Sequence, residues 1–277
     1  MDAITHDPSS WLAARYGGDA PTAAAPPANA VLDTLLGHRS VRAFLPAPLA
    51  DGVLETLVAA AQSAPTSSNQ QAWSVIAVRD PARKARLAAL SNNQRFITQA
   101  PLFLCWVADL SRLTRLGEAN GKRLEGLDYL ESYMVALVDA ALAAQNALVA
   151  AESLGLGTVY VGALRHKPEE AAAELGLPPN AFAAFGMSIG HPDPAVPSAV
   201  KPRLPQSLVL HHESYAMADE GAAIARYDER LGAFSEAVGM GKLDWTKRML
   251  SRVGTAASLS GRHRMKEALR TLGFTLR

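Results

Sequence analysis

Apolar positions along the chain fall into runs of two kinds. Short runs rich in β-branched or aromatic residues predict buried strands at Val75–Val78, Leu102–Ala108, Thr158–Val161 and Phe182–Ile189. Longer stretches with helical spacing lie between them and predict helices over Asp51–Ser63, Pro81–Leu90, Asp128–Leu154 and Pro168–Leu175. Strands separated by helices in this way favour an α/β or α+β fold with one central sheet.

The predicted helix from Asp128 to Leu154 is apolar on nearly every face, with interruptions at Asp139, Gln145 and Asn146. A helix of this kind must be covered on all sides, and a dimer interface provides such cover. The interruptions leave fewer than the roughly 20 clean apolar residues that a membrane span requires. We therefore predict a core helix at the interface of a homodimer, with no membrane partner.

The pattern weakens towards both ends of the chain. Residues 1–30 are rich in Ala, Pro, Gly and Asp and predict a flexible N-terminal arm. Residues 31–277 are expected to form the main domain, whose C-terminal part from about residue 215 is a helical extension. Within the main domain, residues 109–127 predict a mobile, charged connection.

Composition narrows the functional class. The chain has 277 residues, of which 49% are apolar, and a net charge of +1. That balance gives no bulk electrostatic reason to expect nucleic acid or a membrane surface as a partner, and it favours a small-molecule function. The one cysteine, Cys105, lies in an apolar run and predicts a buried side chain. Because the N-terminus has no basic segment followed by an apolar core, we expect a cytoplasmic protein.

Several common catalytic motifs are missing from the sequence. No Gly-x-Gly-x-x-Gly follows a predicted strand, and there is no P-loop and no Gly-x-Ser-x-Gly. His211 and His212 have no third ligand at metal spacing, so we expect no metal site. The remaining candidates are clusters that could bind an organic cofactor.

Two basic clusters have the chemistry of phosphate sites. His38, Arg39, Ser40 and Arg42 directly follow Gly37, which ends a predicted helix and delivers the cluster onto a loop. Forked guanidinium groups with a short hydroxyl are well suited to a phosphate monoester, although a solvated surface loop has the same composition. Lys201-Pro202-Arg203 is the second cluster, and its cations point the same way from an extended backbone.

A run of short polar side chains extends from Ser63 to Trp73, between a predicted helix and a predicted strand. Such a run is either a simple exit loop or a rim of hydrogen-bonding groups for the edge of a heteroaromatic ring. The residues alone leave both interpretations open.

Taken in order and spacing, these segments resemble the FMN-dependent nitroreductase superfamily, in the branch of oxygen-insensitive NADPH nitroreductases and NADPH-flavin oxidoreductases. The resemblance runs from about Val31 to the C-terminus and includes Ala144–Gly157, Lys201–Pro205 and Tyr227–Glu229. It implies an α+β nitroreductase-like fold, with a central mixed sheet surrounded by helices. It also implies an intertwined homodimer with a long central interface helix and with FMN bound noncovalently at the subunit interface.

The same resemblance implies roles for individual residues. The phosphate and ribityl end of FMN would be bound by His38, Arg39, Ser40, Arg42, Lys201 and Arg203. The edge of the flavin ring would be contacted by Thr66, Ser67, Ser68 and Gln94, and the region near N5 by the strand end Tyr160, Val161, Gly162 and Ala163. Arg262, and less strongly Arg165, would recognise nitro or phosphate oxygens of a substrate; a solvated charge at a helix end is the alternative for each.

The implied activity is an FMN-dependent NAD(P)H oxidoreductase that reduces nitroaromatics, quinones or related acceptors by two-electron ping-pong transfer. Flavin N5 carries the hydride, so no protein side chain is assigned a catalytic role. The alternatives are a flavin reductase that supplies reduced FMN to a partner monooxygenase and a noncatalytic flavin-binding protein. Residues 239–242, Gly-Met-Gly-Lys, have no arginine where this branch recognises the 2′-phosphate of NADPH, so the choice between NADPH and NADH stays open.

Overall fold

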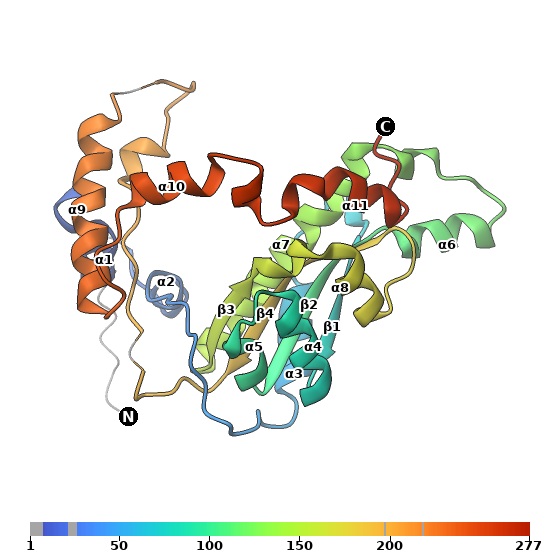
Figure 1. Ribbon diagram of the computed structural model, residues 1–277, viewed down its shortest axis with the longest axis horizontal. Coiled ribbons are helices and arrows are strands. Elements are labelled where there is room, and N and C mark those ends of the chain that lie inside the picture. The colour runs from blue at the N-terminus through green and yellow to red at the C-terminus, as the bar shows by residue number, and fades with distance from the viewer. Residues whose placement is uncertain (1–7, 22–26, 197, 218) are drawn as a thin grey trace. The chain divides into compact units, whose positions relative to one another are not determined.

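The computed structural model describes residues 8–21, 27–196, 198–217 and 219–277, which form two compact units. Unit 1 comprises the N-terminal residues up to Arg39 together with Ala195–Ser258, and unit 2 comprises Ser40–Pro194 and Leu259–Arg277 (Figure 1). Residues 1–7 and 22–26 of the predicted N-terminal arm lie outside the described residues.

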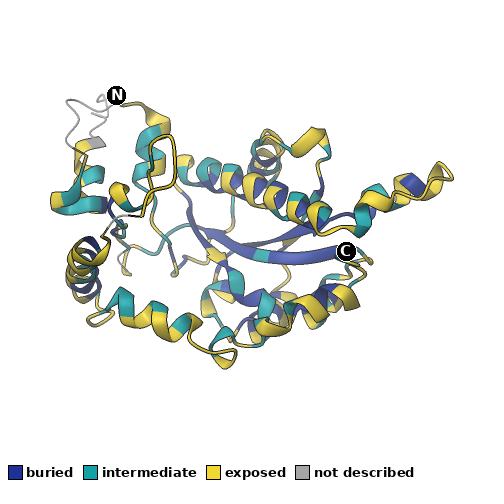
Figure 2. Cartoon of the chain, turned by 90° about the horizontal axis from the view of Figure 1, so that it is seen from above, coloured by how far each residue is buried: buried dark blue, intermediate teal, exposed yellow. Residues whose placement is uncertain are grey.

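Unit 2 is built on a four-stranded sheet, and each strand matches a strand predicted from the sequence. Its order is β1-β2-β4-β3, with β1 (Trp73–Val78), β2 (Leu102–Asp109), β3 (Gly157–Val161) and β4 (Ala181–Gly190). Its helices are α3 (Val53–Gln62), α4 (Pro81–Leu90), α5 (Arg95–Gln99), α6 (Ser111–Ala119), α7 (Leu130–Ser153), α8 (Pro168–Leu175) and α11 (Met265–Thr271). All eight residues of β2 are buried, and Figure 2 shows the buried strands between helices on two sides.

The three strand pairings of this sheet are antiparallel, whereas the sequence predicted a mixed sheet. A parallel contact is present only as an isolated bridge between Ser40 and Thr158 among the pairings of the described chain. For β1 and β2, the two helices α4 and α5 between them explain why the pairing is antiparallel. Two successive helices return the chain to the end of the sheet that it left, so that Val78 pairs with Phe103.

Two apolar cores pack against opposite faces of the sheet. Leu104, Trp106 and Met187 point to the face covered by α3 and α7. Phe103 and Cys105 point to the face covered by α4, α5 and α8. Cys105 is fully buried, as predicted, and burial raises the pKa of its thiol. Because both faces are covered, the central strands are continuously apolar rather than alternating.

Helix α7 packs one face against the sheet and exposes an apolar face on its other side. Its inner face consists mostly of alanines, which allow close packing on the strands and are fully buried at Ala136, Ala140, Ala143, Ala144 and Ala147. On the outer face, the exposed fractions of Met134, Val138 and Leu142 are 51%, 54% and 40%. In the described part of the chain, α7 is also the one helix long and apolar enough to cross a membrane, and 44% of its most apolar window is buried within the protein.

Helix α6 lies inside the segment that the sequence predicted to be a mobile connection. Buried Asp109 holds its start: Oδ1 accepts from the Ser111 amide at 2.9 Å, and Oδ2 accepts from Ser74 Oγ at 2.5 Å. Burial opposes ionisation, but these hydrogen bonds outweigh it and lower the pKa of the Asp109 carboxyl. The predicted connection over residues 109–127 therefore contains a helix, Ser111–Ala119, that the sequence analysis did not foresee, and its mobility stays a prediction.

Unit 1 is helical and contains α1 (Pro8–Tyr16), α2 (Ala30–Leu36), α9 (Gly221–Ala237) and α10 (Trp245–Val253). Asp228 links α9 to α10, because its carboxylate accepts hydrogen bonds from the Thr246 amide at 3.0 Å and from Thr246 Oγ1 at 2.6 Å. Tyr227 packs edge-on against Trp245 with ring centroids 5.8 Å apart. The flexibility of the N-terminal arm stays a prediction, but its described part includes helix α1, which the sequence analysis did not foresee.

Close packing at Gly186 gives a stability prediction. A Cβ at this position in β4 would lie 2.2 Å from Cζ of the buried Phe103 ring, so the ring or the strand must move. We expect Gly186→Ala to lower the free energy of unfolding by about 3 kcal/mol, the upper end of overpacking costs. Gly126→Ala, where a Cβ meets nothing within 4 Å, is the matched control. Urea unfolding of both variants measures the difference, and equal midpoints would contradict the packing argument.

Candidate functional site

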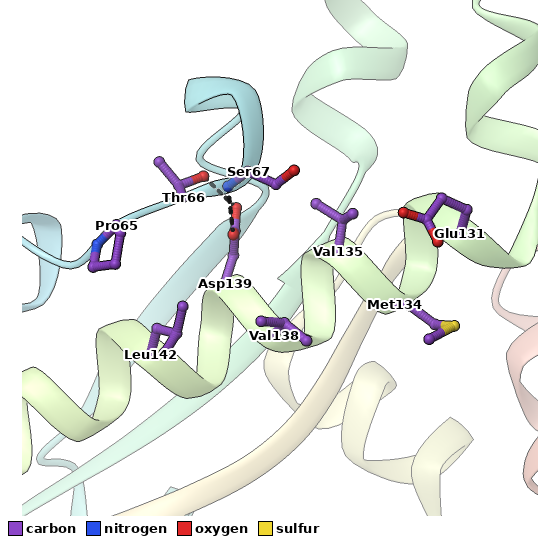
Figure 3. A pocket seen from close by; sticks show the side chains of 9 residues that line it. All are labelled: Pro65, Thr66, Ser67, Glu131, Met134, Val135, Val138, Asp139 and Leu142. Atoms are coloured by element: carbon purple, nitrogen blue, oxygen red, sulfur yellow. Dashed lines mark hydrogen bonds between the residues drawn. The ribbon is translucent and has the colours of Figure 1, made fainter. Parts of the chain in front are cut away.

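A buried carboxylate anchors the polar run that the sequence singled out. Asp139 on α7 is 2% exposed, and its Oδ2 accepts hydrogen bonds from Thr66 Oγ1 at 2.5 Å and from the Ala72 amide at 3.1 Å. Its Oδ1 accepts from the Ser67 amide at 3.3 Å. Figure 3 shows the Asp139 side chain pointing from the helix to the start of this loop. Three donors therefore satisfy a charge that would otherwise be costly to bury.

The same loop has an unusual backbone. Ser68, Asn69 and Gln71 have φ angles of 50°, 55° and 49°, in the left-handed region that favours glycine. The Gln71 amide donates to Thr66 Oγ1 at 2.9 Å, so that hydroxyl both donates and accepts within the protein. Thr66 therefore has its hydroxyl committed to Asp139, whereas Ser67 and Ser68 are exposed. A strained conformation of this kind persists only where surrounding contacts fix it.

A cleft of about 420 Å³ lies between this loop and the outer face of α7. Its polar side is made by Thr66 and Ser67, and its apolar wall by residues that follow one another along the helix: Met134, Val135, Val138 and Leu142 (Figure 3). The apolar wall is exposed and lies directly beside the polar groups of the loop.

Gln94 lies elsewhere in unit 2. It is the residue before α5, a helix that packs on the face of the sheet opposite to α7. Its amide Oε1 is buried and has no hydrogen-bond partner in the described part of the chain. A buried acceptor without a partner costs free energy, so this atom is suited to accept from a bound ligand.

The end of β3 presents the other predicted ring contacts. The Tyr160 hydroxyl donates to Gln145 Oε1 on α7 at 3.4 Å, and its ring meets Phe185 edge-on at 5.4 Å. Burial, with Glu152 nearby, raises the pKa of Tyr160. Val161 and Ala163 are buried in the core on the other face. The contacts of Tyr160, Val161 and Ala163 fix the position of this strand end.

Gly162 at the end of β3 lies beside the guanidinium of Arg165. A Cβ there would lie 3.1 Å from Nη2 of Arg165, so the glycine makes room for a guanidinium that folds back over it. Arg165 Nη1 donates to the carbonyl of Ala184, and burial lowers the pKa of this arginine despite Tyr133 nearby. The next residue, His166, lies with Nε2 at 2.8 Å from Nη2 of Arg262. The two arginines predicted to border the substrate pocket thus belong to one cluster of unit 2.

The first basic segment spans the boundary between the units. In unit 2, Ser40 forms the parallel bridge with Thr158, and the Val41 amide donates to the Thr158 carbonyl at 2.9 Å. Gly157 permits this approach, since a Cβ there would be 2.7 Å from the Val41 side chain. Ser40 and exposed Arg42 therefore flank the strand whose end carries Tyr160.

In unit 1, the structure brings the rest of the two basic segments together. Arg15 of α1 donates to the carbonyls of His38 at 2.8 Å and Lys201 at 3.0 Å. Arg39 Nε donates to Ser198 Oγ at 3.1 Å, and Arg203 Nη1 lies 3.2 Å from the carbonyl of Lys201. His38 and Lys201, 163 positions apart by their numbers, are thus joined through one guanidinium.

Comparison with known proteins identifies the family. The sequence profile described as "Nitroreductase family" matches residues 35–191, and that described as "Nitroreductase family, C-terminal domain" matches residues 201–277. The chain belongs to the nitroreductase family. The family predicted from the sequence is therefore confirmed, together with its α+β fold.

Three similar proteins represent this family. "FMN reductase [NAD(P)H]" of Bacillus subtilis is 43% identical over 74% of this chain and 83% of its own length. "Oxygen-insensitive NADPH nitroreductase" of Salmonella typhimurium is 38% identical over 73% of this chain and 81% of its own. The solved structure of the NADPH:FMN oxidoreductase from Vibrio harveyi complexed with NAD⁺ is 32% identical, covers 90% of this chain and 100% of that one, and has a TM-score of 0.80.

Three further features of this chain bear on its site: an additional helix, the segment 239–242 and the absence of a metal-binding cluster among the described residues. Helix α1 precedes the matched residues, which begin at 35. In residues 239–242, Lys242 is exposed and packs its aliphatic stem near Gly232 of α9, with Cγ at 3.3 Å from a Cβ placed there. Among the described residues, no group of three or more His, Cys, Asp or Glu side chains is placed to hold a metal ion.

Sequence reasoning missed Arg15 and Asp139, the two residues that hold the candidate segments. Asp139 had a visible signal, since it is an isolated carboxylate in an otherwise apolar helix. Arg15 had none, because its partners lie 21, 23 and 186 residues away along the chain.

The role of Asp139 gives a prediction about the polar loop. Asp139→Asn places an NH₂ group where the loop presents donors, so we expect the free energy of unfolding to fall by about 2 kcal/mol. We also expect faster hydrogen exchange at the Ser67 and Ala72 amides, measured by mass spectrometry or NMR. Asp51→Asn, an exposed carboxylate of the same unit, is the control. Unchanged exchange at both amides would show that Asp139 does not hold the loop.

Proposed function

We propose that this chain binds FMN and uses it to carry hydride equivalents from NADPH or NADH to nitroaromatics, quinones or related small molecules. FMN and a nicotinamide donor appear in the names of its relatives, as in the FMN reductase of Bacillus subtilis and the Vibrio harveyi complex with NAD⁺. The predicted enzyme class, FMN-dependent NAD(P)H oxidoreductase, and its cofactors are thereby confirmed. Membership of the family over residues 35–191 and 201–277 is the observation that carries the proposal.

The residues present fit a flavin. The partnerless Gln94 Oε1 is an acceptor for an N–H on the edge of the ring. The exposed Ser67 hydroxyl, on the loop that Asp139 holds, is a second polar group for the edge of the ring. Both fits come from groups that the protein itself leaves unsatisfied or exposed.

When bound, FMN supplies hydride-transfer chemistry at its ring, so the chain needs no nucleophile of its own. The chain contributes binding and orientation. We assign the phosphate and ribityl contacts to the two basic segments, through His38, Arg39, Ser40, Arg42, Lys201 and Arg203. The strand end Tyr160–Ala163 is assigned to the ring near N5, where its main-chain N–H groups would stabilise negative charge. Arg165 and Arg262 are assigned to oxygens of the acceptor.

The proposed ring contacts favour a homodimer. Ser67 is tied to α7 on one face of the sheet, and Gln94 precedes α5 on the opposite face. Because the sheet separates them, a single flat ring that contacts both takes one residue from each of two copies. The outward Met134, Val138 and Leu142 supply the apolar surface for a second copy. We therefore propose a homodimer with α7 at its interface, acting on small molecules in the cytoplasm.

The function is tested with the purified protein under anaerobic conditions. We expect a flavin absorption spectrum that bleaches on addition of NADPH or NADH and returns on addition of one equivalent of a quinone or nitroaromatic. A protein that takes up no FMN would contradict the proposal, and so would bound flavin that neither nicotinamide reduces. Turnover of free FMN with a much lower KM than of organic acceptors would instead identify the flavin-reductase alternative.

The dimer is tested by placing a charge on the outer face of α7. We expect Val138→Asp to give a monomer that has lost most of its FMN, since burying an unpaired carboxylate at the interface costs several kcal/mol. Leu116→Asp, at an apolar residue of α6 with 57% exposure, is the control and should remain dimeric. Light scattering coupled to gel filtration measures the mass. A Val138→Asp dimer that retains its flavin would place the interface elsewhere.

A further inference from the structure

The N-terminal helix α1 contributes a buried cation to unit 1. Arg15 is 6% exposed, and its guanidinium donates to three main-chain carbonyls: Leu36 at 3.1 Å, His38 at 2.8 Å and Lys201 at 3.0 Å. Its own carbonyl accepts from the Arg203 amide at 2.8 Å. One residue therefore binds the main chain of both basic segments.

Two further contacts fasten this helix in place. Trp11 packs over Gly37, with its ring carbons 3.6 Å from the position that a Cβ would take. Arg230 of α9 donates to the carbonyl of Tyr16 and to that of Arg203 at 3.2 Å. It also pairs with Asp19 at 3.1 Å, and Asp19 has its pKa lowered by Arg226 and Arg230 against the opposing effect of burial. Contacts at Trp11 and at Tyr16 therefore hold α1 on both sides of Arg15.

The hydrogen bonds of Arg15 also constrain where the side chains of the two basic segments lie. A guanidinium is planar and rigid, so carbonyls that it binds at the same time are held at a separation set by its width. His38 and Lys201 are held in this way, and their neighbours Arg39 and Arg203 follow from the same stretches of backbone. Further hydrogen bonds then fix the two guanidinium groups: Arg39 Nε donates to Ser198 Oγ at 3.1 Å, and Arg203 Nη1 donates to the Lys201 carbonyl at 3.2 Å.

We propose that Arg15 is a positioning residue for phosphate recognition: it fixes the main-chain separation between His38–Arg39 and Lys201–Arg203 so that both segments can bind one phosphate group. This inference rests on the proposed binding of FMN. It concerns a residue outside the family match, which begins at residue 35. The N-terminal segment, for which the sequence suggested no role, would therefore serve the cofactor without contacting it.

Comparison of FMN with riboflavin isolates the phosphate, because the two ligands share the ring and the ribityl chain. The apoprotein is titrated with each ligand, and flavin fluorescence quenching gives the two dissociation constants. We expect wild-type protein to bind FMN at least 100-fold more tightly than riboflavin. Arg15→Ala should weaken FMN binding about tenfold and leave riboflavin binding unchanged, the loss typical of removing a supporting contact to a charged group.

Companion variants separate positioning from folding. Arg15→Lys keeps the charge but lacks the planar fork, so it should behave like Arg15→Ala. Trp11→Ala keeps Arg15 and loosens α1, so it should lose a smaller part of the FMN preference. Arg203→Ala removes a proposed phosphate ligand and is the positive control, while Arg248→Ala, an exposed arginine of α10, should equal wild type.

The outcomes distinguish this inference from the function on which it rests. Wild-type protein with equal affinity for FMN and riboflavin would contradict the proposed phosphate site itself. A wild-type preference that Arg15→Ala and Trp11→Ala both retain would overturn only the role of Arg15. An equal loss of FMN and riboflavin affinity would show that Arg15 acts on general stability, and that result would also overturn the proposal.

Discussion

A buried charge is stable in this chain only where fixed main-chain partners satisfy it, and that constraint shapes both segments expected to contact the cofactor. In unit 2 the charge is an anion: Asp139 collects the amides of Ser67 and Ala72 and the hydroxyl of Thr66. In unit 1 it is a cation, and Arg15 collects the carbonyls of three residues from two distant segments. Each charge holds in place a loop that has little apolar surface of its own.

Helix α7 combines several roles in one element because its faces differ. Its alanine face packs closely on the sheet, and Asp139 projects from it to fix the polar loop. The outer stripe of Met134, Val138 and Leu142 is exposed in the described chain. If a second copy covers that stripe, the loop held by Asp139 is delivered to the ring site of the partner. Assembly and cofactor binding are then one event rather than two.

Local signals were sufficient to predict most of the core from the sequence. The strand predicted at Leu102–Ala108 is observed at Leu102–Asp109, and the helix predicted at Asp128–Leu154 at Leu130–Ser153. Both are long apolar runs in which periodicity and burial agree. Antiparallel pairing was not predictable, because it depends on two helices that return the chain to the end of the sheet it left. Helix α6 was missed because its many charged residues resemble a loop, while its start is fixed by Asp109.

The sequence indicated the residue types of the candidate site but not their contacts within the protein. Short polar residues at 66–68 offered hydrogen-bonding groups, and the structure commits one of them, the Thr66 hydroxyl, to Asp139. Gly162 makes room for the Arg165 guanidinium, a contact that no local pattern indicated. The contacts of Arg15 span up to 186 residues, and no local pattern encodes them. What a sequence shows is which chemistry is available, whereas tertiary contacts decide which groups remain for a ligand.

The central claim is that a cluster of cations on fixed backbone holds the phosphate of FMN. The most direct measurement is the ³¹P resonance of FMN in the purified holoprotein as the pH is varied. A free phosphate monoester changes its charge near a pKa of about 6, and nearby cations favour the dianion and lower that pKa. The account predicts a bound resonance that stays constant through this range. A bound phosphate that titrates with the midpoint of free FMN would contradict it.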